Sequence, residues 1–391
     1  MMGQMRTPLA DDAARRAAVA DITHSFLVEA GAGSGKTAVL AGRIVMLLAG
    51  GVHPRHIAAV TFTELAASEL VMRIRTFVDR LCRGDVPAEL RIALPDGLDP
   101  AQQAALAAAG ADMDDMTCST IHGFCQRLIS PYPVEADMDP GAVLVDPGEG
   151  GLIFGEITEN WLRDVLSGDD DSLIATMAIE DPTGTLGHIN GILHCLRARP
   201  DLVTPPLPDL NAALTDYIRA QETFAAFCSG EGAIEAETRM LGAGFMDLAH
   251  VARQVRDTDT PLHRIRLLRT QPPEGARKSD GGWKGYRRKG KWVAAVAANG
   301  GSKADAEALN DQATTLYNTC QETWQAAQAA VAAYVLHDLL GLLRPVISRF
   351  RDHKRMVGLL DFDDLIFTAR NLLRDHVMVR HALGVRFSHV L

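Results

Sequence analysis

The fold is decided by the stretch Ala30-Gly31-Ala32-Gly33-Ser34-Gly35-Lys36-Thr37. A short apolar run, residues 25–30, comes before it and predicts a strand. An apolar helical pattern, residues 38–48, follows it and ends at Gly50-Gly51. A glycine loop between a strand and a helix is typical of polyphosphate binding, because the loop N–H groups and the helix dipole both point at the anion.

Within this loop the side chains have separate predicted roles. Lys36 reaches the terminal phosphates of ATP and the Thr37 hydroxyl ligates Mg²⁺, and these two residues are the predicted catalytic pair. The strict motif has a glycine where this chain has Ala30, so the match is to a relaxed form. The alternative is an ordinary glycine turn with a solvated lysine. The predicted nucleotide contacts are Ala30, Gly31, Ala32, Gly33, Ser34, Gly35, Lys36 and Thr37.

Two more strands are predicted downstream, at residues 57–63 and 116–120. Each is followed by a helical pattern, at residues 65–83 and 121–129. Strands that alternate with helices indicate a parallel α/β sheet.

After Pro140 the chain changes character, because β-branched runs become rare and alanine-rich helical stretches dominate. The segment 270–302 is rich in glycine and basic residues and predicts a loop or hairpin. Residues 362–391 predict a helix and then a strand that begins at about Phe387. The best helix candidates are residues 206–226, 232–256 and 303–350, the last with a kink at Pro345.

The composition limits the class of protein. The chain has 391 residues, 47% of them hydrophobic and 23% charged, which excludes wholesale disorder. No membrane span or export signal is expected, and the protein is predicted to be cytoplasmic. The six cysteines have no CxxC spacing, so they indicate reduced thiols rather than a disulfide set or a zinc site.

The net charge is −10, which argues against nucleic-acid binding through bulk charge. The charge is uneven, however. The segment 264–291 holds ten basic and two acidic residues, a local net of +8, so the remainder carries −18. Trp283, Tyr286 and Trp292 interleave with these charges, a pattern that suits phosphate contacts and stacking. The alternative is a solvated basic loop.

Four motifs in order carry a family resemblance. The phosphate loop, residues 30–37, resembles the first motif of superfamily 1 helicases of the UvrD/Rep type. Residues 60–70 (VTFTELAASEL) resemble motif Ia, residues 119–127 (STIHGFCQR) resemble motif Ib, and residues 360–365 (LDFDDL) resemble an element that precedes the Walker B motif. The forms of the second and third motifs are closer to the RecB/AddA branch.

The resemblance implies a fold and a domain arrangement. Residues 1–145 would form the first part of a P-loop RecA-like parallel-sheet domain, called 1A. Residues 146–350 would form a mostly α-helical insertion domain, 1B, and residues 351–391 would return to domain 1A. The basic segment would then lie in the insertion, which in this family touches duplex DNA, and its predicted DNA contacts are Arg287, Arg288 and Lys289.

The resemblance also implies contacts with single-stranded DNA. Phe62 and Thr63 match one strand-contacting turn of the family, and Thr120 and His122 match a second. An exposed aromatic side chain is suited to this role because base stacking tolerates any sequence.

Each of these residues also has a structural interpretation that involves no ligand. Phe62 follows an apolar strand and would then be a core residue, and His122 would be a helix-start residue with a satisfied hydrogen bond. For the three aspartates of the fourth motif we favour a capping role over a catalytic one, because carboxylates stabilise a first helical turn. These are Asp361, Asp363 and Asp364.

Two departures from the family pattern affect the prediction. The family usually reads adenine with a glutamine upstream of the phosphate loop, and this chain has Arg15 near that place. The Walker B Asp-Glu pair is expected directly after residues 387–391, where the sequence stops. We therefore expect this chain to be the N-terminal part of a longer protein and to lack the hydrolytic carboxylates.

The resemblance predicts the N-terminal region of an ATP-dependent DNA helicase of double-strand-break repair and recombination. The complete protein would move along single-stranded DNA, 3′ to 5′, with ATP and Mg²⁺ as cofactors. Its expected partners are single-stranded and duplex DNA and an AddB-like nuclease subunit, with no membrane. The alternative is an ATP- and DNA-binding module without hydrolytic activity of its own. A small-molecule P-loop kinase would leave the later motifs unexplained.

Overall fold

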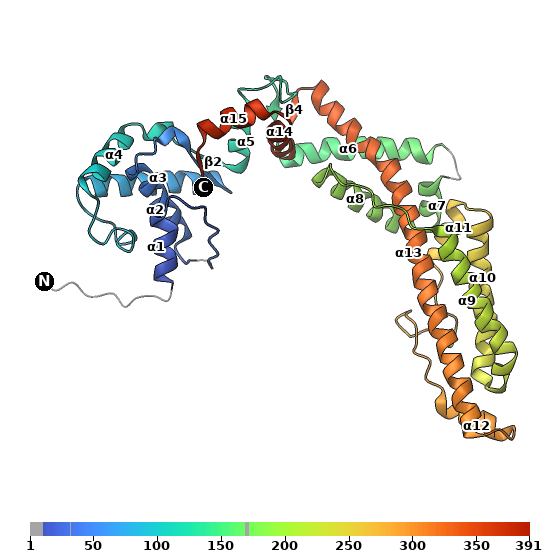
Figure 1. Ribbon diagram of the computed structural model, residues 1–391. Coiled ribbons are helices and arrows are strands. Elements are labelled where there is room, and N and C mark those ends of the chain that lie inside the picture. The colour runs from blue at the N-terminus through green and yellow to red at the C-terminus, as the bar shows by residue number, and fades with distance from the viewer. Residues whose placement is uncertain (1–10, 32, 169–171) are drawn as a thin grey trace. The chain divides into compact units, whose positions relative to one another are not determined.

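The structure, a computed structural model, describes residues 11–31, 33–168 and 172–391. It is a mixed α/β structure, mostly helical, with a small parallel sheet. The chain forms two compact units. The first consists of Met1–Gly150 together with Lys354–Leu391, and the second of Gly151–His353 (Figure 1).

The sheet of the first unit has the order β2-β1-β5, and both pairings are parallel, as the alternation of strands and helices predicts. The central strand β1 pairs with β2 from Ala58↔Thr117 to Thr61↔Thr120. A separate two-stranded parallel ribbon joins β3 to β4. The strand bounds are β1 (Ile57–Thr61), β2 (Thr117–Thr120), β3 (Val143–Leu144), β4 (Leu359–Leu360) and β5 (His389–Val390).

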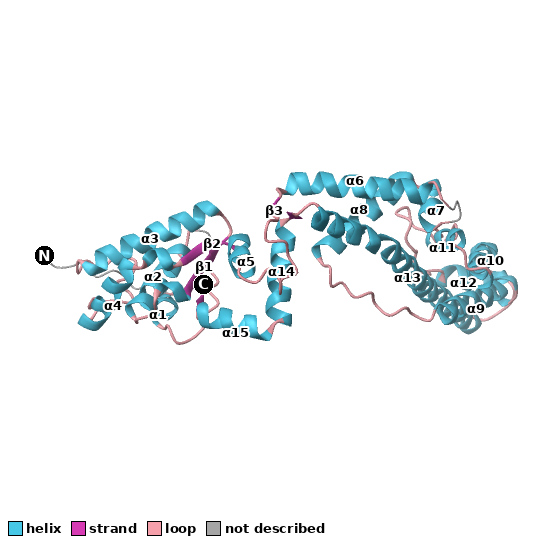
Figure 2. Ribbon diagram, turned by 90° about the horizontal axis from the view of Figure 1, so that it is seen from above, coloured by secondary structure: helices cyan, strands magenta, loops and turns pink. Residues whose placement is uncertain are grey.

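Strand β1 is buried on both faces because its side chains alternate between two cores. Ile57 and Ala59 pack into the core formed with α1, α2, α3 and α4. Ala58 points the other way, into a core shared with α5, α14 and α15. All three side chains are fully buried, as expected for an apolar segment of a strand that is covered on both faces. In Figure 2, β1 and β2 lie between α2 and α3 on one side and α5 on the other. The helices of the first unit are α1 (Asp12–Ala20), α2 (Lys36–Ala49), α3 (Glu64–Cys82), α4 (Pro100–Ala111), α5 (Ile121–Ile129), α14 (Phe362–Asp375) and α15 (Val377–Arg386).

The strand predicted at residues 25–30 is wrong. Within the part of the chain that the structure describes, this segment has no strand, and Leu27 is 90% exposed. An apolar run becomes a strand only where a neighbouring edge completes its backbone hydrogen bonds. On this side β1 is paired by β5, whose ladder the backbone of Leu391 extends through hydrogen bonds with Ala58 and Val60, both at 2.8 Å.

The second unit is built around α13 (Lys303–Met356), a helix of 54 residues. Ala327, Val331, Val335 and Leu339 recur every four residues along it and are buried in one core. Pro345 lies inside this helix, which continues to Met356. The other helices are α6 (Pro147–Leu166), which begins in the first unit, α7 (Leu173–Glu180), α8 (Pro182–Ala198), α9 (Leu210–Ser229), α10 (Ala236–Asp257), α11 (Pro261–Leu268) and α12 (Lys289–Ala298).

By length and composition α13 is also the one helix among the described residues that is apolar enough to cross a membrane. Its stripe of buried side chains identifies it as the core helix of the second unit. The helices predicted at residues 206–226, 232–256 and 303–350 are confirmed as α9, α10 and α13, with ends shifted by a few residues.

Two predicted elements differ in detail. In the segment 270–302, Arg277 and Trp283 form an antiparallel bridge, as a hairpin requires, but residues 289–298 form helix α12. This helix buries Trp292 and Val296 four residues apart, a spacing that the neighbouring glycines obscure. Near the C-terminus, two helices, α14 and α15, replace the single predicted one, and neither glycine nor proline marks the break at His376.

Candidate nucleotide-binding site

The phosphate loop leads directly into α2, whose first residue is Lys36. Gly33 and Gly35 have φ of 74° and 85°, a left-handed conformation that favours glycine. The residue before the helix is Gly35, so no side chain caps this N-terminus, and no acidic residue lies in the first turn. The positive end of the helix dipole is therefore left for an external anion.

The Lys36 side chain folds back onto the phosphate loop. Its ammonium donates to the carbonyl of Ala30 at 2.8 Å and to that of Gly31 at 2.9 Å. The Ser34 hydroxyl also donates to Gly31, at 2.7 Å. Lys36 and Thr37 are both exposed, so these contacts are ones that water or phosphate replaces at little cost. Ala32, a predicted contact, lies outside the described residues.

The loop has room for a ligand. A Cβ atom placed on Gly31 or Gly33 would meet nothing within 4 Å. A pocket of about 250 Å³ lies between the loop and α1, lined by Asp11, Arg15 and Lys36 among others. The residues present thus fit a polyphosphate: an exposed cation, an uncapped helix start and open space beside them.

Arg15, near the expected glutamine position, contacts the loop directly. Its Nη1 donates to the Ser34 carbonyl at 2.8 Å, and its Nε donates to Asp11 at 2.7 Å. The hydrogen bond and the charge of Asp11 raise the pKa of the Arg15 guanidinium. A guanidinium has only donors, whereas a glutamine amide presents both a donor and an acceptor.

The predicted DNA contacts lie at the carboxyl ends of adjacent strands. Phe62 follows β1 and is 89% exposed, which excludes the alternative that it is a core residue. Thr63 and Thr120 are the N-caps of α3 and α5, accepting from the N–H groups of Ala66 and Gly123.

A side-chain hydrogen bond joins these two turns. The Thr120 hydroxyl donates to Glu64 at 3.0 Å, and Glu64 begins α3 directly after Thr63. His122 lies against Phe362 of α14, with ring centroids 4.5 Å apart. The structure therefore brings the two predicted turns together at one edge of the sheet.

Two of the three aspartates of the fourth motif cap α14, as the capping interpretation predicts, and the third, Asp363, lies in its first turn. Asp361 accepts from the Asp364 N–H, and Asp364 accepts from the Asp361 N–H, both at 2.9 Å. The buried ammonium of Lys354 donates to Asp361 at 2.9 Å and to Asp364 at 2.5 Å. Burial raises the pKa of Asp364, and its hydrogen bonds and Lys354 oppose that rise.

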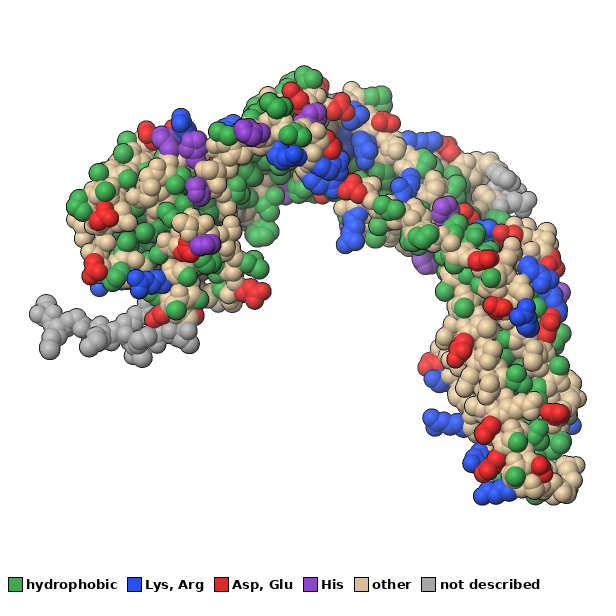
Figure 3. All heavy atoms as spheres, in the orientation of Figure 1, with side chains coloured by type: hydrophobic (Ala, Val, Ile, Leu, Met, Phe, Trp, Pro, Cys, Tyr) green, Lys and Arg blue, Asp and Glu red, His purple; other side chains and the backbone are tan. Residues whose placement is uncertain are grey.

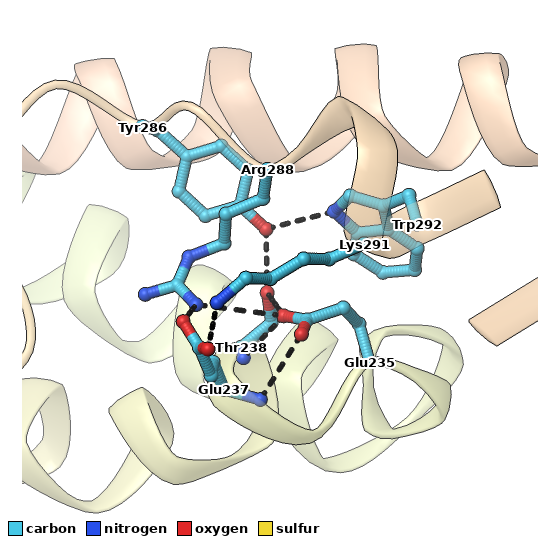
Figure 4. Close-up of polar contacts among 7 residues, drawn as sticks. All are labelled: Glu235, Glu237, Thr238, Tyr286, Arg288, Lys291 and Trp292. Atoms are coloured by element: carbon cyan, nitrogen blue, oxygen red, sulfur yellow. Dashed lines mark hydrogen bonds and ion pairs between the residues drawn. The ribbon is translucent and has the colours of Figure 1, made fainter. Parts of the chain in front are cut away.

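The basic segment of the second unit is only partly available to a ligand. Arg288, with 12% of its side chain exposed, forms ion pairs with Glu235 and Glu237 at the start of α10, and Lys291 also pairs with Glu237 (Figure 4). This geometry contradicts the prediction that Arg288 is free to contact DNA, because its charge is already paired. Arg287 and Lys289 are exposed, and Lys289 lies 3.1 Å from Glu307.

The aromatic residues of that segment are structural. Trp283 and Trp292 are 7% and 0% exposed and belong to one aromatic core, so the prediction that they stack on DNA is wrong. Trp292 donates to the Tyr286 hydroxyl at 3.0 Å, which lies 2.5 Å from the Thr238 hydroxyl. Around α12, basic side chains stand next to acidic ones (Figure 3), so the local excess of positive charge is smaller than the sequence count indicates.

Sequence reasoning missed Arg43 of α2. It donates to three backbone carbonyls ahead of the phosphate loop and lines a second pocket, of about 520 Å³, together with Lys36. No motif marks it, because its partners are backbone atoms that any sequence supplies.

The chain resembles the AddA subunits of bacterial ATP-dependent helicase/nucleases in sequence. The AddA subunit of Moorella thermoacetica is 27% identical over 381 residues, 90% of this chain and 26% of the relative. Those of Levilactobacillus brevis and Pediococcus pentosaceus are 34% and 30% identical, each over 39% of this chain and about a tenth of the relative (11% and 12%). This chain thus spans from about a tenth to a quarter of these relatives' length.

Residues 11–391, nearly the whole chain, match the family described as "UvrD/REP helicase N-terminal domain". The match covers the phosphate loop, the paired turns at the sheet edge and the helical second unit. The chain belongs to the UvrD/REP helicase N-terminal domain family.

Proposed function

We propose that this chain is the ATP-binding N-terminal region of an ATP-dependent DNA helicase that moves along single-stranded DNA, 3′ to 5′, in double-strand-break repair and recombination. The observation that carries the proposal is the uncapped start of α2, where Lys36 stands exposed behind two left-handed glycines. The family match and the exposed Phe62 on the same unit support it.

The domain assignment is part of the proposal. The RecA-like domain 1A, residues 1–145 and 351–391, would correspond to the first compact unit, and the insertion 1B, residues 146–350, would correspond to the second, with boundaries a few residues away from those of the compact units. We infer that the protein acts in the cytoplasm, on single-stranded and duplex DNA and with an AddB-like nuclease subunit. The names of the relatives support the last inference.

In the proposed mechanism the loop reorganises around the nucleotide. Lys36 would leave the carbonyls of Ala30 and Gly31 to hold the phosphates, and Thr37, exposed in the first turn of α2, would hold Mg²⁺. Bound ATP with Mg²⁺ would supply the free energy of hydrolysis for movement. Phe62 would stack on a base, and Thr63, Thr120 and His122, which lie at the carboxyl ends of β1 and β2, would contact the same strand of DNA.

The second unit would contact duplex DNA through its exposed cations. Of the basic triplet, Arg287 and Lys289 are the residues we assign to phosphates, since both side chains are exposed, whereas Arg288 is largely buried against two glutamates. The ion pair of Lys289 with Glu307 is exposed, so a phosphate can replace it at little cost. Reversing both charges should weaken duplex binding and flatten its dependence on salt by about two released counterions. Reversing Arg288 should instead destabilise the second unit. An unchanged salt slope in the Arg287→Glu/Lys289→Glu variant contradicts the phosphate role.

ATP binding and DNA-stimulated ATP hydrolysis by the purified chain test the proposal. We expect ATP binding that Lys36→Ala abolishes, and single-strand binding that Phe62→Ala weakens about tenfold, since stacking contributes about 1–3 kcal/mol per base. ATP binding without DNA-stimulated turnover agrees with the proposal and with the second candidate, an ATP- and DNA-binding module without hydrolytic activity of its own, whereas turnover by this chain alone would exclude the second candidate. Absence of ATP binding would refute both.

A further inference from the structure

Arg43 lies seven residues after Lys36 on α2, so about two helical turns separate the two side chains. Its Nη1 donates to the carbonyl of Ala18 at 2.9 Å and to that of Asp21 at 2.7 Å. Its Nη2 donates to the carbonyl of His24 at 2.6 Å. One guanidinium thus binds three carbonyls within a span of seven residues.

These carbonyls belong to the chain that enters the phosphate loop. Ala18 lies in the last turn of α1, and Asp21 is the residue at its C-cap, where carbonyls lack intrahelical partners. His24 lies beyond the helix. The ring of Phe26, two residues further, lies under the guanidinium at 5.0 Å from its carbon to the ring centroid. Arg43 therefore contacts the chain from the last turn of α1 to Phe26, which lies within the apolar run of residues 25–30.

The packing beside Arg43 shows that this contact is built into the fold. A Cβ atom on Gly42 would lie 2.6 Å from Leu90 and 3.2 Å from Val19. Glycine at this position therefore lets α1 approach α2 closely, and that approach brings the carbonyls of α1 within reach of Arg43.

The same side chain faces the ladder strand β5. Burial, with the nearby positive charges of Arg43 and His56, lowers the pKa of His389. Arg43, Lys36 and residues 388–391 line one pocket with residues 22–26. Arg43 thus lines the same pocket as the residues of β5 and the segment that leads to the loop.

We propose that Arg43 is a positioning residue for nucleotide binding: it holds residues 18–26 against the helix that carries Lys36, so that the phosphate loop starts from a defined point. The inference rests on the proposed ATP binding. Residues 25–30 form no strand, and Arg43 fixes the segment just before them through the carbonyls of Ala18, Asp21 and His24. Without Arg43 the loop would lose more conformational entropy when it closes on phosphates.

Only arginine suits this position. Its planar fork offers donors in several directions at once, whereas the ammonium of lysine is a point charge on a flexible stem. Arg43→Lys should therefore recover part of the affinity lost in Arg43→Ala. A general loss of stability would not follow this order so closely.

The test measures the dissociation constant for ATP in the 391-residue chain, with hydrogen–deuterium exchange across residues 19–31. We expect Arg43→Ala to raise the dissociation constant about tenfold or more, and Arg43→Lys to raise it less. Exchange in residues 19–31 should become faster in both variants without nucleotide. The matched control is Arg380→Ala, because Arg380 likewise donates to backbone carbonyls, those of Leu373 and Arg374 at the end of α14.

The outcomes separate the two proposals. If the wild-type chain binds no ATP, the proposed function fails, and faster exchange in the Arg43 variants still tests the positioning contact. If the wild type binds ATP and a folded Arg43 variant binds it equally well, the positioning role is overturned. If Arg43→Ala does not fold, Arg43→Lys decides by the same comparison. An equal loss of ATP affinity in Arg380→Ala also overturns it, because the effect would then be general.

Discussion

Helices α2 and α14 belong to the same compact unit and begin in opposite ways. Helix α14 starts with its own anions, because Asp361 and Asp364 cap each other's N–H groups and the buried Lys354 ammonium pairs with both carboxylates. Helix α2 starts after a glycine, without a carboxylate in its first turn, and its lysine reaches back to loop carbonyls.

This difference between the two N-termini indicates which of them is open to a ligand. Both helices have the same kind of dipole and the same unpaired N–H groups at the first turn. At α14 the chain satisfies them internally with two carboxylates and the buried ammonium of Lys354, which closes this start. At α2 it leaves them to an external anion. Charged residues near a helix start are therefore evidence of a site only when they leave the N–H groups open.

The largest effect is expected at the uncapped N-terminus of α2. Lys36→Ala should raise the dissociation constant for ATP at least about a hundredfold, because hydrogen bonds to charged groups and the Coulomb attraction are lost together. The thermal midpoint should hardly change, since the side chain is exposed. Isothermal titration calorimetry measures the first quantity and circular dichroism the second. Retained affinity in Lys36→Ala would mean that α2 is not the phosphate site.

A substitution at the capped N-terminus of α14 should lower stability and leave ATP affinity nearly unchanged. Asp361→Ala removes a cap and one partner of a buried lysine, and we expect it to destabilise the first unit by about 3 kcal/mol. ATP affinity should stay within about twofold, because no bound anion is lost. Asp361→Asn keeps an oxygen that can accept from the Asp364 N–H and should lose less.

Two optical probes separate the units in this experiment. All four tryptophans (161, 283, 292 and 324) lie in the second unit, so urea unfolding followed by tryptophan fluorescence reports on that unit. Circular dichroism reports on both. We expect Asp361→Ala to shift the circular dichroism transition of the first unit and leave the fluorescence transition near its wild-type midpoint. An equal shift of both transitions would show that the cap supports the whole chain instead.

Much of the fold could be predicted because its signals are local. The helical patterns at residues 65–83 and 121–129 and the strand beginning at Ile57 became α3, α5 and β1, since apolar spacing and N-cap threonines decide them. The apolar run at residues 25–30 shows the limit. A strand also needs a partner edge, and no property of those six residues says whether one is present.

The residues of the candidate site likewise fall into those that the sequence predicts and those that it does not. The glycines and Lys36 are recognisable because a phosphate loop needs backbone freedom and a cation at a set spacing. Arg288 could not be judged from sequence, because its partners Glu235 and Glu237 lie about fifty residues earlier and are brought to it by packing. Arg43 was invisible for a different reason, since it binds carbonyls rather than side chains.

A third helix, α4, provides a second capped N-terminus to compare with that of α14. Helix α4 also has a capping box, in which Asp99 accepts from the Gln102 N–H at 2.8 Å and the Gln102 side chain accepts from the Asp99 N–H. This box is exposed and holds no buried cation. Asp99→Ala should therefore cost about 1 kcal/mol, clearly less than Asp361→Ala. Urea unfolding followed by circular dichroism compares the two, and equal losses would mean that Lys354 adds nothing at α14.

The smallest expected effect tests what the open start requires of its backbone. Gly33 has φ of 74° and Gly31 has no such conformation, while a Cβ atom on either would meet nothing within 4 Å. Gly33→Ala should thus add only conformational strain, about 1 kcal/mol, and lower ATP affinity about fivefold. Gly31→Ala is the matched control and should have a smaller effect. Equal losses in both variants, measured by calorimetry, would show that the phosphates approach the loop too closely for any Cβ, and that space rather than backbone conformation selects glycine there.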